Sequence, residues 1–453
     1  MQAIMTNKSG LYAITGKLFN RVNIAPLIAF RIMFGFLLMV HSISIIANGI
    51  VYQHFVSPPF TFTFIGFEFL QSLAGPGMYW YVTAMAILAA LVMIGAWYRF
   101  AMFGYSLMWT ILYLMQKAGY NNHYYLVLLL CWIMFLMPAD RYFSADVKRG
   151  AVKESATCPQ YCIWLFIFQV SVMYFFAAIS KITPDWFSGK FMAIQFSRLG
   201  QHPVLGFIYG NDWFHSFICY AGFLFDLLIV PSLLLKRTRP FAFIILCCFH
   251  LFNSYTFKLG IFPYLSIALS VFFFEAFAVN RIFFRKNPVI PVISDERSMK
   301  PLSAKLVTGS IFLYTLFQLL LPIRYMMFSG NVFWTEEGYR MSWKMMLRTK
   351  SGNLYYTVHD PVSKKTWKVE PSRIFSLSHM RTLSTSPDII WQYAQFIKKG
   401  FEKKGYPDVQ VFAIGTVSLN RNTARPLVKP DADLASIKWE PFRHSSWITD
   451  FPE

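Results

Sequence analysis

The stretch Tyr174-Phe-Phe-Ala-Ala-Ile-Ser-Lys-Ile-Thr-Pro-Asp-Trp186 ends an apolar run that begins near Gln160. The run carries no charge before Lys181, and Pro184 interrupts it shortly afterwards. A lysine at the end of a membrane helix has two interpretations. It can be an anchor whose ammonium reaches the lipid headgroups. It can also be a general base, because removal from water disfavours the ammonium form. The lysine alone favours the anchor, so the decision rests on the rest of the chain.

The composition is that of a membrane protein. Of 453 residues, 56% are hydrophobic and only 14% are charged. A soluble protein of this length would carry more charge, so we expect a polytopic α-helical membrane protein. The formal net charge of +20 would suggest nucleic acid, but most basic residues lie in loops between apolar runs. There they indicate topology. We therefore expect membrane lipids, and no nucleic acid, as partners.

Nine apolar runs are long enough to cross a bilayer, although the third and fourth are short. They are Ile24–Ile46, Met78–Trp97, Ala101–Met115, Tyr124–Met137, Tyr161–Ile179, Phe214–Leu235, Phe241–Phe257, Ile261–Val279 and Leu306–Leu321. We expect a mainly α fold: a polytopic membrane helix bundle of about nine spans, over residues 1–324, with a C-terminal extracytoplasmic mixed α/β domain over residues 325–453. The first run follows basic residues and is predicted to be an uncleaved signal anchor.

The basic residues predict the orientation. Nine spans place the two termini on opposite sides, and with the N-terminus in the cytoplasm 17 loop Lys and Arg residues lie inside and 5 outside. The outer five are Lys117, Lys181, Lys190, Arg198 and Lys258. The positive-inside rule therefore favours a plasma (inner) membrane protein with a cytoplasmic N-terminus. Everything after Arg324 is then extracytoplasmic.

The last 130 or so residues differ in composition from the spans. Leu354–Val358 and Thr366–Val369 flank an Asp-Pro pair and predict a hairpin. Pro387–Lys404 has apolar residues at helical spacing, and Val409–Leu419 alternates as a strand does. No cysteine follows residue 248, so a disulfide cannot stabilise this domain. We expect one mixed α/β domain on the outer membrane face.

Polar residues from separate stretches converge at the outer end of the bundle. Asn121, Asn122 and His123 open the fourth span, Lys181 closes the fifth, and His250 and Asn253 lie in the outer half of the seventh. An amphipathic ligand could reach this depth from the bilayer. The predicted site therefore lies at the outer membrane face.

Each feature also has a simpler explanation. The Asn-Asn-His sequence can be a helix cap, and His250 can bond a neighbouring helix. Aromatic residues such as Tyr174 can line a quinone pocket or form an interfacial belt. Arg31 and Asp226 both lie within spans, where a buried pair between the first and sixth helices is the simpler account. A transporter or scaffold is thus still open, although neither inverted repeats nor broken helices are evident.

Common catalytic motifs are missing from the sequence. No GxSxG, P-loop, HExxH or dinucleotide fingerprint occurs in a supporting context. Cys158 and Cys162 have no second pair or histidine cluster to complete a metal site, so no metal is expected.

Nine short motifs accompany the opening stretch. They are Gly95-Ala-Trp-Tyr-Arg99, Asn121-Asn-His-Tyr-Tyr125, Tyr142-Phe-Ser-Ala-Asp146, Phe225-Asp-Leu227, Phe249-His-Leu-Phe-Asn-Ser254, Gly260-Ile-Phe262, Trp334-Thr335, Ser342-Trp-Lys-Met-Met346 and Trp439-Glu-Pro-Phe-Arg-His-Ser-Ser-Trp447. With these motifs the chain resembles the vitamin K-dependent gamma-glutamyl carboxylases, of a bacterial type. Order and spacing are kept from the first span almost to the last residue. Each motif is weak alone, but the set is specific.

The resemblance implies that a reduced naphthoquinol (phylloquinol or menaquinol) reacts with O2 and becomes an epoxide, and that this drives carboxylation of glutamate in a peptide or protein by CO2. It implies that Lys181 is the base, used as the neutral amine. Asn122 and His123 match the pair that holds the quinol oxygen. The quinol site would include Asn121, Tyr174, His250 and Asn253, and glutamate would bind at Trp343 and Arg348.

The chain also departs from the animal members, which have a lysine where Ser180 stands and a disulfide that this chain lacks. The glutamate-binding region departs more than the membrane core. A quinol epoxidase without carboxylation is therefore an open alternative.

Overall fold

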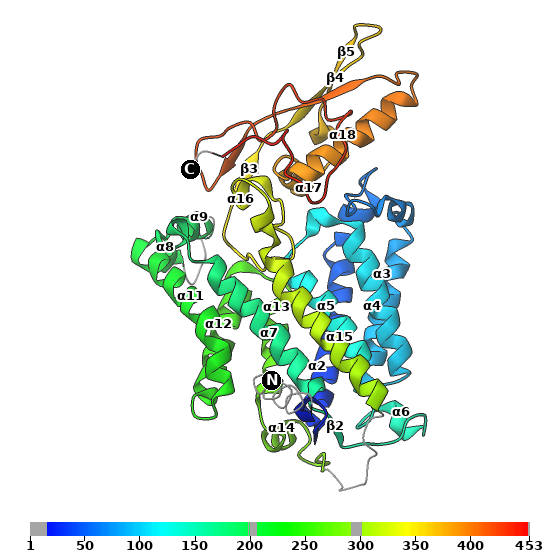
Figure 1. Cartoon of the computed structure of the whole chain (residues 1–453), viewed down its shortest axis with the longest axis vertical. Helices are drawn as coiled ribbons and strands as arrows, with labels where there is room; N and C mark the ends of the chain where they lie inside the picture. The colour runs from blue at the N-terminus through cyan, green and yellow to red at the C-terminus, as the bar shows by residue number, and fades with distance from the viewer. Residues whose placement is uncertain (1–15, 198, 200–205, 291–300, 452–453) are drawn as a thin grey trace, which may run out of the picture.

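The computed structural model describes residues 16–197, 199, 206–290 and 301–451. Lys8, Arg198, Arg297 and Lys300, which entered the charge count, lie outside these ranges. The protein is mainly helical. A helix bundle carries a sheet-containing C-terminal region at one end (Figure 1). Helices α6 and α14 lie at the opposite end of the bundle, whereas α8 and α9 lie near the C-terminal region.

A helix overlaps each of the nine predicted spans. These helices are α2 (Ala25–Ala47), α3 (Met78–Ile94), α4 (Tyr98–Met115), α5 (Asn122–Leu136), α7 (Tyr161–Ser180), α11 (Asp212–Leu234), α12 (Arg239–Phe257), α13 (Phe262–Leu269) with the following 3-10 turn, and α15 (Pro301–Leu320). Shorter helices are α6 (Ala145–Lys148), α8 (Pro184–Phe187), α9 (Lys190–Ser197), α10 (Gly206–Tyr209), α14 (Ala276–Phe283) and α16 (Val332–Thr335). Strands β1 (Arg21–Asn23) and β2 (Thr157–Pro159) pair beside the bundle.

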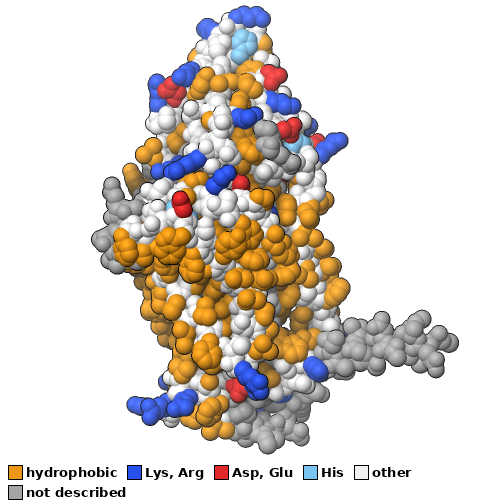
Figure 2. All heavy atoms as spheres, turned by 90° about the vertical axis from the view of Figure 1, so that its left-hand side faces the viewer, with side chains coloured by type: hydrophobic (Ala, Val, Ile, Leu, Met, Phe, Trp, Pro, Cys, Tyr) orange, Lys and Arg blue, Asp and Glu red, His pale blue; other side chains and the backbone are white. Residues whose placement is uncertain are grey.

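Not all nine helices have the length and hydropathy of a membrane span. Within the described ranges, five candidates do: α2, α7, α11, α12 and the segment Leu302–Met327. Three further apolar helices are shorter, among them α3 with 17 residues. At 1.5 Å per residue such a helix measures about 26 Å, which is less than the ~30 Å hydrocarbon core. On the face that Figure 2 shows, hydrophobic side chains cover most of the helical part, and charged side chains lie toward its ends.

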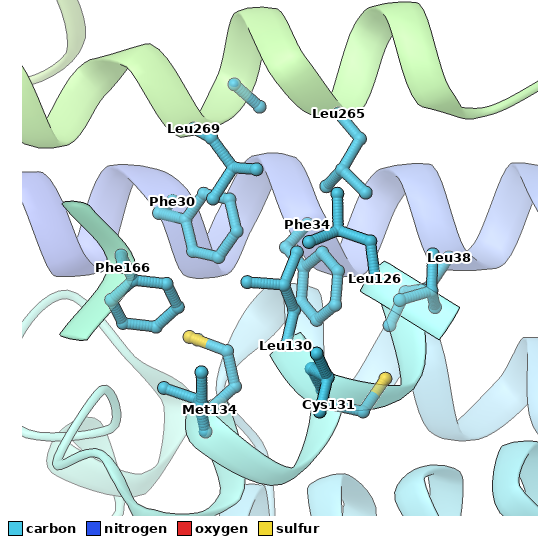
Figure 3. Packing of buried hydrophobic residues seen from close by; sticks show 14 of the residues in the cluster. Phe30, Phe34, Leu38, Leu126, Leu130, Cys131, Met134, Phe166, Leu265 and Leu269 are labelled. Atoms are coloured by element: carbon cyan, nitrogen blue, oxygen red, sulfur yellow. The ribbon is translucent and has the colours of Figure 1, made fainter. Parts of the chain in front are cut away.

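The core of the bundle forms where α2 meets α5, α7 and α13. Phe30 and Phe34 of α2 stack on each other with ring centroids 5.2 Å apart. Phe166 of α7 stacks on Phe272 at 4.3 Å, and leucines of α5 and α13 fill the remaining space (Figure 3). At Gly35, α2 comes so close to α3 that an added Cβ would lie 2.5 Å from the backbone of Met93. This close approach fixes the spacing of the two helices.

The predicted pair between Arg31 and Asp226 is wrong. The Arg31 guanidinium donates to the carbonyl oxygens of Ala139 at 2.9 Å and Phe143 at 2.7 Å, in the loop after α5. Loop carbonyls have no helical partner, so they can accept from a buried guanidinium. Asp226 forms its salt bridge with Lys181 instead.

The C-terminal region holds a three-stranded antiparallel sheet in the order β5-β4-β6. Its strands are β4 (Tyr355–His359), β5 (Thr366–Val369) and β6 (Gln410–Ile414), and β3 (Lys350–Gly352) pairs separately with β7 (Val417–Leu419). The predicted hairpin is confirmed, because β4 and β5 pair antiparallel. Helices α17 (Leu377–Leu383) and α18 (Pro387–Glu402) accompany the sheets, and the apolar face predicted for α18 is buried.

The predicted strand Val409–Leu419 is divided between the two sheets. It breaks at Gly415, where a Cβ would lie 2.1 Å from the carbonyl oxygen of Asn353. Only a glycine permits this backbone approach. The segment between α2 and α3 also reaches this domain: Phe60 and Phe62 join its core, and the Gln392 amide donates to the Thr63 carbonyl at 3.1 Å.

Candidate functional site

A small cavity of about 70 Å³ lies where α5, α7, α11, α12 and α13 converge. Its polar lining residues are His123, Tyr174, Lys181, Asp226, His250 and Asn253. Aromatic rings and the side chains of Met192, Met345 and Met346 form much of the remaining wall. Methionine is unbranched and flexible, so this wall can adapt to a ligand larger than the present space.

Lys181 sits at the point where α7 ends. It is the C-terminal cap residue of α7, and the Thr183 hydroxyl then caps α8, which Pro184 begins. The lysine is 6% exposed. Its ammonium forms a salt bridge with Asp226 of α11 and lies 5.3 Å from the Trp186 ring centroid. The headgroup-anchor interpretation is therefore wrong, because the nitrogen faces the interior of the bundle.

Two histidines, the buried His250 and the partly buried His123, flank Phe262 at the start of α13. The His123 ring stacks on Phe262 with 3.9 Å between centroids, and His250 meets the same ring edge-on at 5.4 Å. The Tyr174 hydroxyl and the His250 Nε2 are 2.8 Å apart. Among the described residues, the Nδ1 of His250 has no hydrogen-bond partner. It is available to a polar group of a ligand.

The two asparagines beside His123 do not line the cavity. The Asn121 side chain caps α5 by accepting from the Tyr124 N–H at 2.8 Å. Asn122 donates to the Lys344 carbonyl at 3.1 Å and accepts from the Tyr120 hydroxyl at 2.7 Å. Both amides thus fix the start of α5. Asn122 also ties it to the segment that contains Lys344, just before the C-terminal sheets. Of the three adjacent residues, His123 alone faces Lys181 across the cavity.

Trp343 and Arg348 lie on either side of the residues that reach the cavity. Trp343 is fully buried in the bundle core, 5.1 Å from the Tyr125 ring. The Arg348 guanidinium pairs with Glu336 at 2.9 Å. Between them, Met345 and Met346 line the cavity. Both methionines belong to the Ser342–Met346 motif, but the sequence offered no reason to assign them to the site, because they carry no polar group.

A wider groove of about 800 Å³ lies next to this cavity. Thr183, Pro184 and Asp185 line one side, and polar residues of the C-terminal region, including Asn331 and Asn420, line the other. Its residue Leu347 follows the cavity residue Met346 in the chain. Within the described ranges, no group of three or more His, Cys, Asp and Glu side chains could hold a metal ion.

The fold and the site define a class of protein: a helical membrane protein with a buried polar site beneath a sheet-containing domain. Comparison with family models shows to which family within this class the chain belongs. Residues 19–277, more than half of the chain, match the HTTM domain, and residues 303–453 match the lumenal domain of vitamin K-dependent gamma-carboxylase. The chain belongs to the vitamin K-dependent gamma-glutamyl carboxylase family. The lumenal-domain match makes the C-terminal domain extracytoplasmic. No solved structure matches the chain.

Proposed function

We propose that the protein is a membrane vitamin K-dependent gamma-carboxylase that couples oxygenation of a naphthoquinol to its epoxide with carboxylation of protein glutamate. The observation that carries this proposal is the buried Lys181–Asp226 pair, which shares a mainly apolar cavity with His123 and His250. The family matches cover both the helical part and the C-terminal domain. They support a reduced vitamin K cofactor and a glutamate-containing protein substrate.

The cavity has the chemistry that a naphthoquinol needs. Rings of Phe249, Phe257 and Phe262 can cover an aromatic bicycle, and the unpartnered His250 Nδ1 can bond an oxygen on it. Reduced vitamin K, when bound, supplies the reaction with O2 that generates a base strong enough for carboxylation. The present space is small, so we expect the methionine wall to move on binding.

The roles of this chain's own groups follow from their contacts. Lys181 Nζ is the proposed acceptor for a proton from the quinol hydroxyl, and it can take that proton only as the neutral amine, that is, when Asp226 holds the proton that the pair shares. Asp226 holds that nitrogen in place and provides a second oxygen to which the proton can pass. Tyr174 fixes the His250 ring through the 2.8 Å contact, and burial of the pair excludes water. Asn122 is proposed to act indirectly, by positioning the start of α5 and thereby His123.

A coupled assay tests this proposal. Purified protein in lipid nanodiscs is supplied with phylloquinol or menaquinol, O2, labelled bicarbonate and a glutamate-containing peptide, and both epoxide and fixed label are measured. We expect both products from the parent protein and neither from Lys181→Ala. Lys190→Ala, which removes an exposed lysine of α9, is the matched control and should retain both. Full turnover by Lys181→Ala would refute the role of the lysine.

One observation favours a second function, quinol epoxidation without carboxylation. Of the two residues predicted to bind glutamate, Arg348 is paired with Glu336 and Trp343 is buried against the Tyr125 ring, and neither lines the Lys181 cavity. Epoxide without fixed label in the same assay selects this function. Neither product from folded protein would refute both functions and favour a transporter or scaffold.

The proposed topology has nine spans, a cytoplasmic N-terminus and a division of the chain at residues 324 and 325. The bundle would hold the quinol, and the C-terminal domain would present the glutamate substrate. Accessibility of single cysteines placed in the loop after α3 and the loop after α4 tests it, because the two loops should label from opposite sides.

A further inference from the structure

A cavity of about 220 Å³ lies near the ends of α2 and α4, apart from the Lys181 cavity. Its wall also includes the π-helical turn Tyr52–Val56, which follows α2, and the start of α5. The two cavities have no lining residue in common. On α5, Tyr124 lines this cavity, whereas the adjacent His123 lines the other. We call it the Tyr113 cavity, after a tyrosine of α4 that lines it.

The wall of the Tyr113 cavity is aromatic and carries no fixed charge. Besides Tyr113, the rings of Phe55, Trp109, Tyr120 and Tyr124 line it. The other described lining residues are Ile45, Ile50, His54, Leu112, Gln116 and Gly119. No lysine, arginine or carboxylate is among the described residues of this wall. The cavity therefore suits an uncharged ligand with a flat apolar surface.

Two polar atoms of the wall have no partner. The Tyr113 hydroxyl and the His54 Nδ1 are buried, and neither forms a hydrogen bond within the described part of the chain. Tyr113 as a whole is 8% exposed. The Gln116 amide, by contrast, donates to the His54 carbonyl at 3.1 Å and accepts from the Ala118 N–H at 3.4 Å. A buried polar group without a partner is costly, so the hydroxyl and the imidazole nitrogen are available to a ligand.

Both of these groups can donate a hydrogen bond. A phenol carries a proton on its oxygen, and a neutral imidazole carries one on either ring nitrogen. Burial, together with the neighbouring His379, lowers the pKa of His54 to about 4, so this imidazole is neutral near pH 7. His379 belongs to α17, and its ring centroid lies 4.6 Å from that of His54. Two donors in an aromatic wall match a flat ring that carries acceptor oxygens.

The Tyr113 cavity lies at a depth that a membrane ligand can reach. Helix α2 ends, and α3 begins, at the end of the bundle that faces the C-terminal domain (Figure 1). At this end Tyr52, Tyr79 and Trp80 are exposed. Exposed aromatic rings at the ends of apolar helices are typical of the boundary between membrane and water. A ring that carries a lipid tail can therefore enter from the outer leaflet.

We propose that the Tyr113 cavity is a second quinone site, which binds the oxidised ring of a membrane naphthoquinone. The carbonyl oxygens of an oxidised quinone accept hydrogen bonds and cannot donate them, and the wall offers two donors. Because no lysine or carboxylate is among the described lining residues, a quinone would be held there and not converted. The choice of a naphthoquinone over another ring lipid rests on the proposed function, which uses such a ring in the Lys181 cavity.

The test counts quinone molecules per chain and does not depend on turnover. The full chain, purified in an uncharged detergent and freed of quinone, is equilibrated with menadione, an oxidised naphthoquinone without a tail. Bound menadione is measured by equilibrium dialysis against empty micelles. We expect two molecules per parent chain, and one in Gly222→Leu, which fills the Lys181 cavity. Two bound quinones without carboxylation would leave the inference intact, whereas an active enzyme that binds one quinone would refute it alone.

Three variants locate the second molecule. Tyr113→Phe removes only an unpartnered hydroxyl, so it should fold and should weaken the second site about fivefold. Ile50→Trp fills the cavity from a half-buried position and should abolish the second site. Tyr105→Phe is the matched control, because Tyr105 is a buried tyrosine of α4 that does not line the cavity. It should bind two molecules as the parent does.

Three results would overturn the proposal. The first is a single bound menadione per parent chain. The second is a second molecule whose binding is unchanged in both Tyr113→Phe and Ile50→Trp. The third is equal competition by 1-decanol, an uncharged chain without a ring, because the cavity would then select apolar bulk and not a quinone ring.

Discussion

Separating the two charges of the Lys181–Asp226 pair should destabilise the protein more than removing both. The side chains of the pair are each 8% exposed, so water cannot replace a lost partner. Lys181→Met or Asp226→Leu alone leaves a buried charge without its counterion, which costs about 3–5 kcal/mol. The double variant replaces the pair by apolar groups and should come within about 1–2 kcal/mol of the parent. The expected coupling free energy is therefore at least about 4 kcal/mol.

The chain offers a matched control pair. Lys236 and Glu275 are close at 2.5 Å, but their side chains are 80% and 56% exposed. An exposed pair contributes at most about 1 kcal/mol, because water and salt screen it. A double-mutant cycle at this pair, with each residue replaced singly and then both together, should thus give only a small coupling free energy.

The assay is chemical unfolding of the four proteins of each cycle in one detergent, with activity measured in parallel. The Lys181→Met/Asp226→Leu variant should fold and yet form no epoxide, which separates loss of the base from loss of the fold. A coupling free energy at the buried pair no larger than that of the exposed pair would refute the reasoning. It would mean that the buried site is hydrated in solution.

Three further predictions follow from the same contacts. Gly222→Leu should fill the 70 Å³ cavity and lower epoxide formation more than tenfold. The loss of stability should be small, because a Cβ at Gly222 meets Trp186 at an ordinary 3.7 Å. The control variant Gly222→Ala should be active, and normal turnover by Gly222→Leu would contradict the prediction. Glu336 has an ordinary pKa of 4.5 that falls to about 2 in the fold, so its stabilisation should be present above pH 4.5 and lost as the pH falls toward 2. Melting temperatures measured between pH 6 and 3 should therefore drop more steeply for the parent than for Glu336→Gln. Gly35→Ala should destabilise the bundle by about 1–3 kcal/mol through its clash with α3, whereas Gly309→Ala, with open space around it, should be nearly neutral in the same unfolding assay.

Elements with a strong local signal were predictable. The runs that became α2, α7, α11 and α12 are long and predominantly apolar, and burial in lipid requires such runs to be helical. The hairpin of β4 and β5 was visible because turn residues separate two strand-like runs. The strand Val409–Leu419 was not resolved into two, because its break depends on a contact with Asn353 that the sequence does not show.

The candidate site was predictable by depth but not by direction. Residues at the outer ends of separate spans meet at one depth, which is why Lys181, His250 and Tyr174 do share a cavity. Successive residues of a helix point about 100° apart, so Asn122 and His123 face different neighbours although they are adjacent. Hydropathy contains no information about this rotation.

By itself the sequence determined that the chain enters a membrane, that its C-terminal part folds differently, and which family it resembles. Each of these depends on composition, periodicity or short motifs, all of which are local. The tertiary structure alone decided that Asp226 meets Lys181 and that Arg31 bonds loop carbonyls. The pairing of charges in a low-dielectric interior depends on how the helices are rotated and packed against one another. Rotation and packing are determined only when the whole bundle has folded.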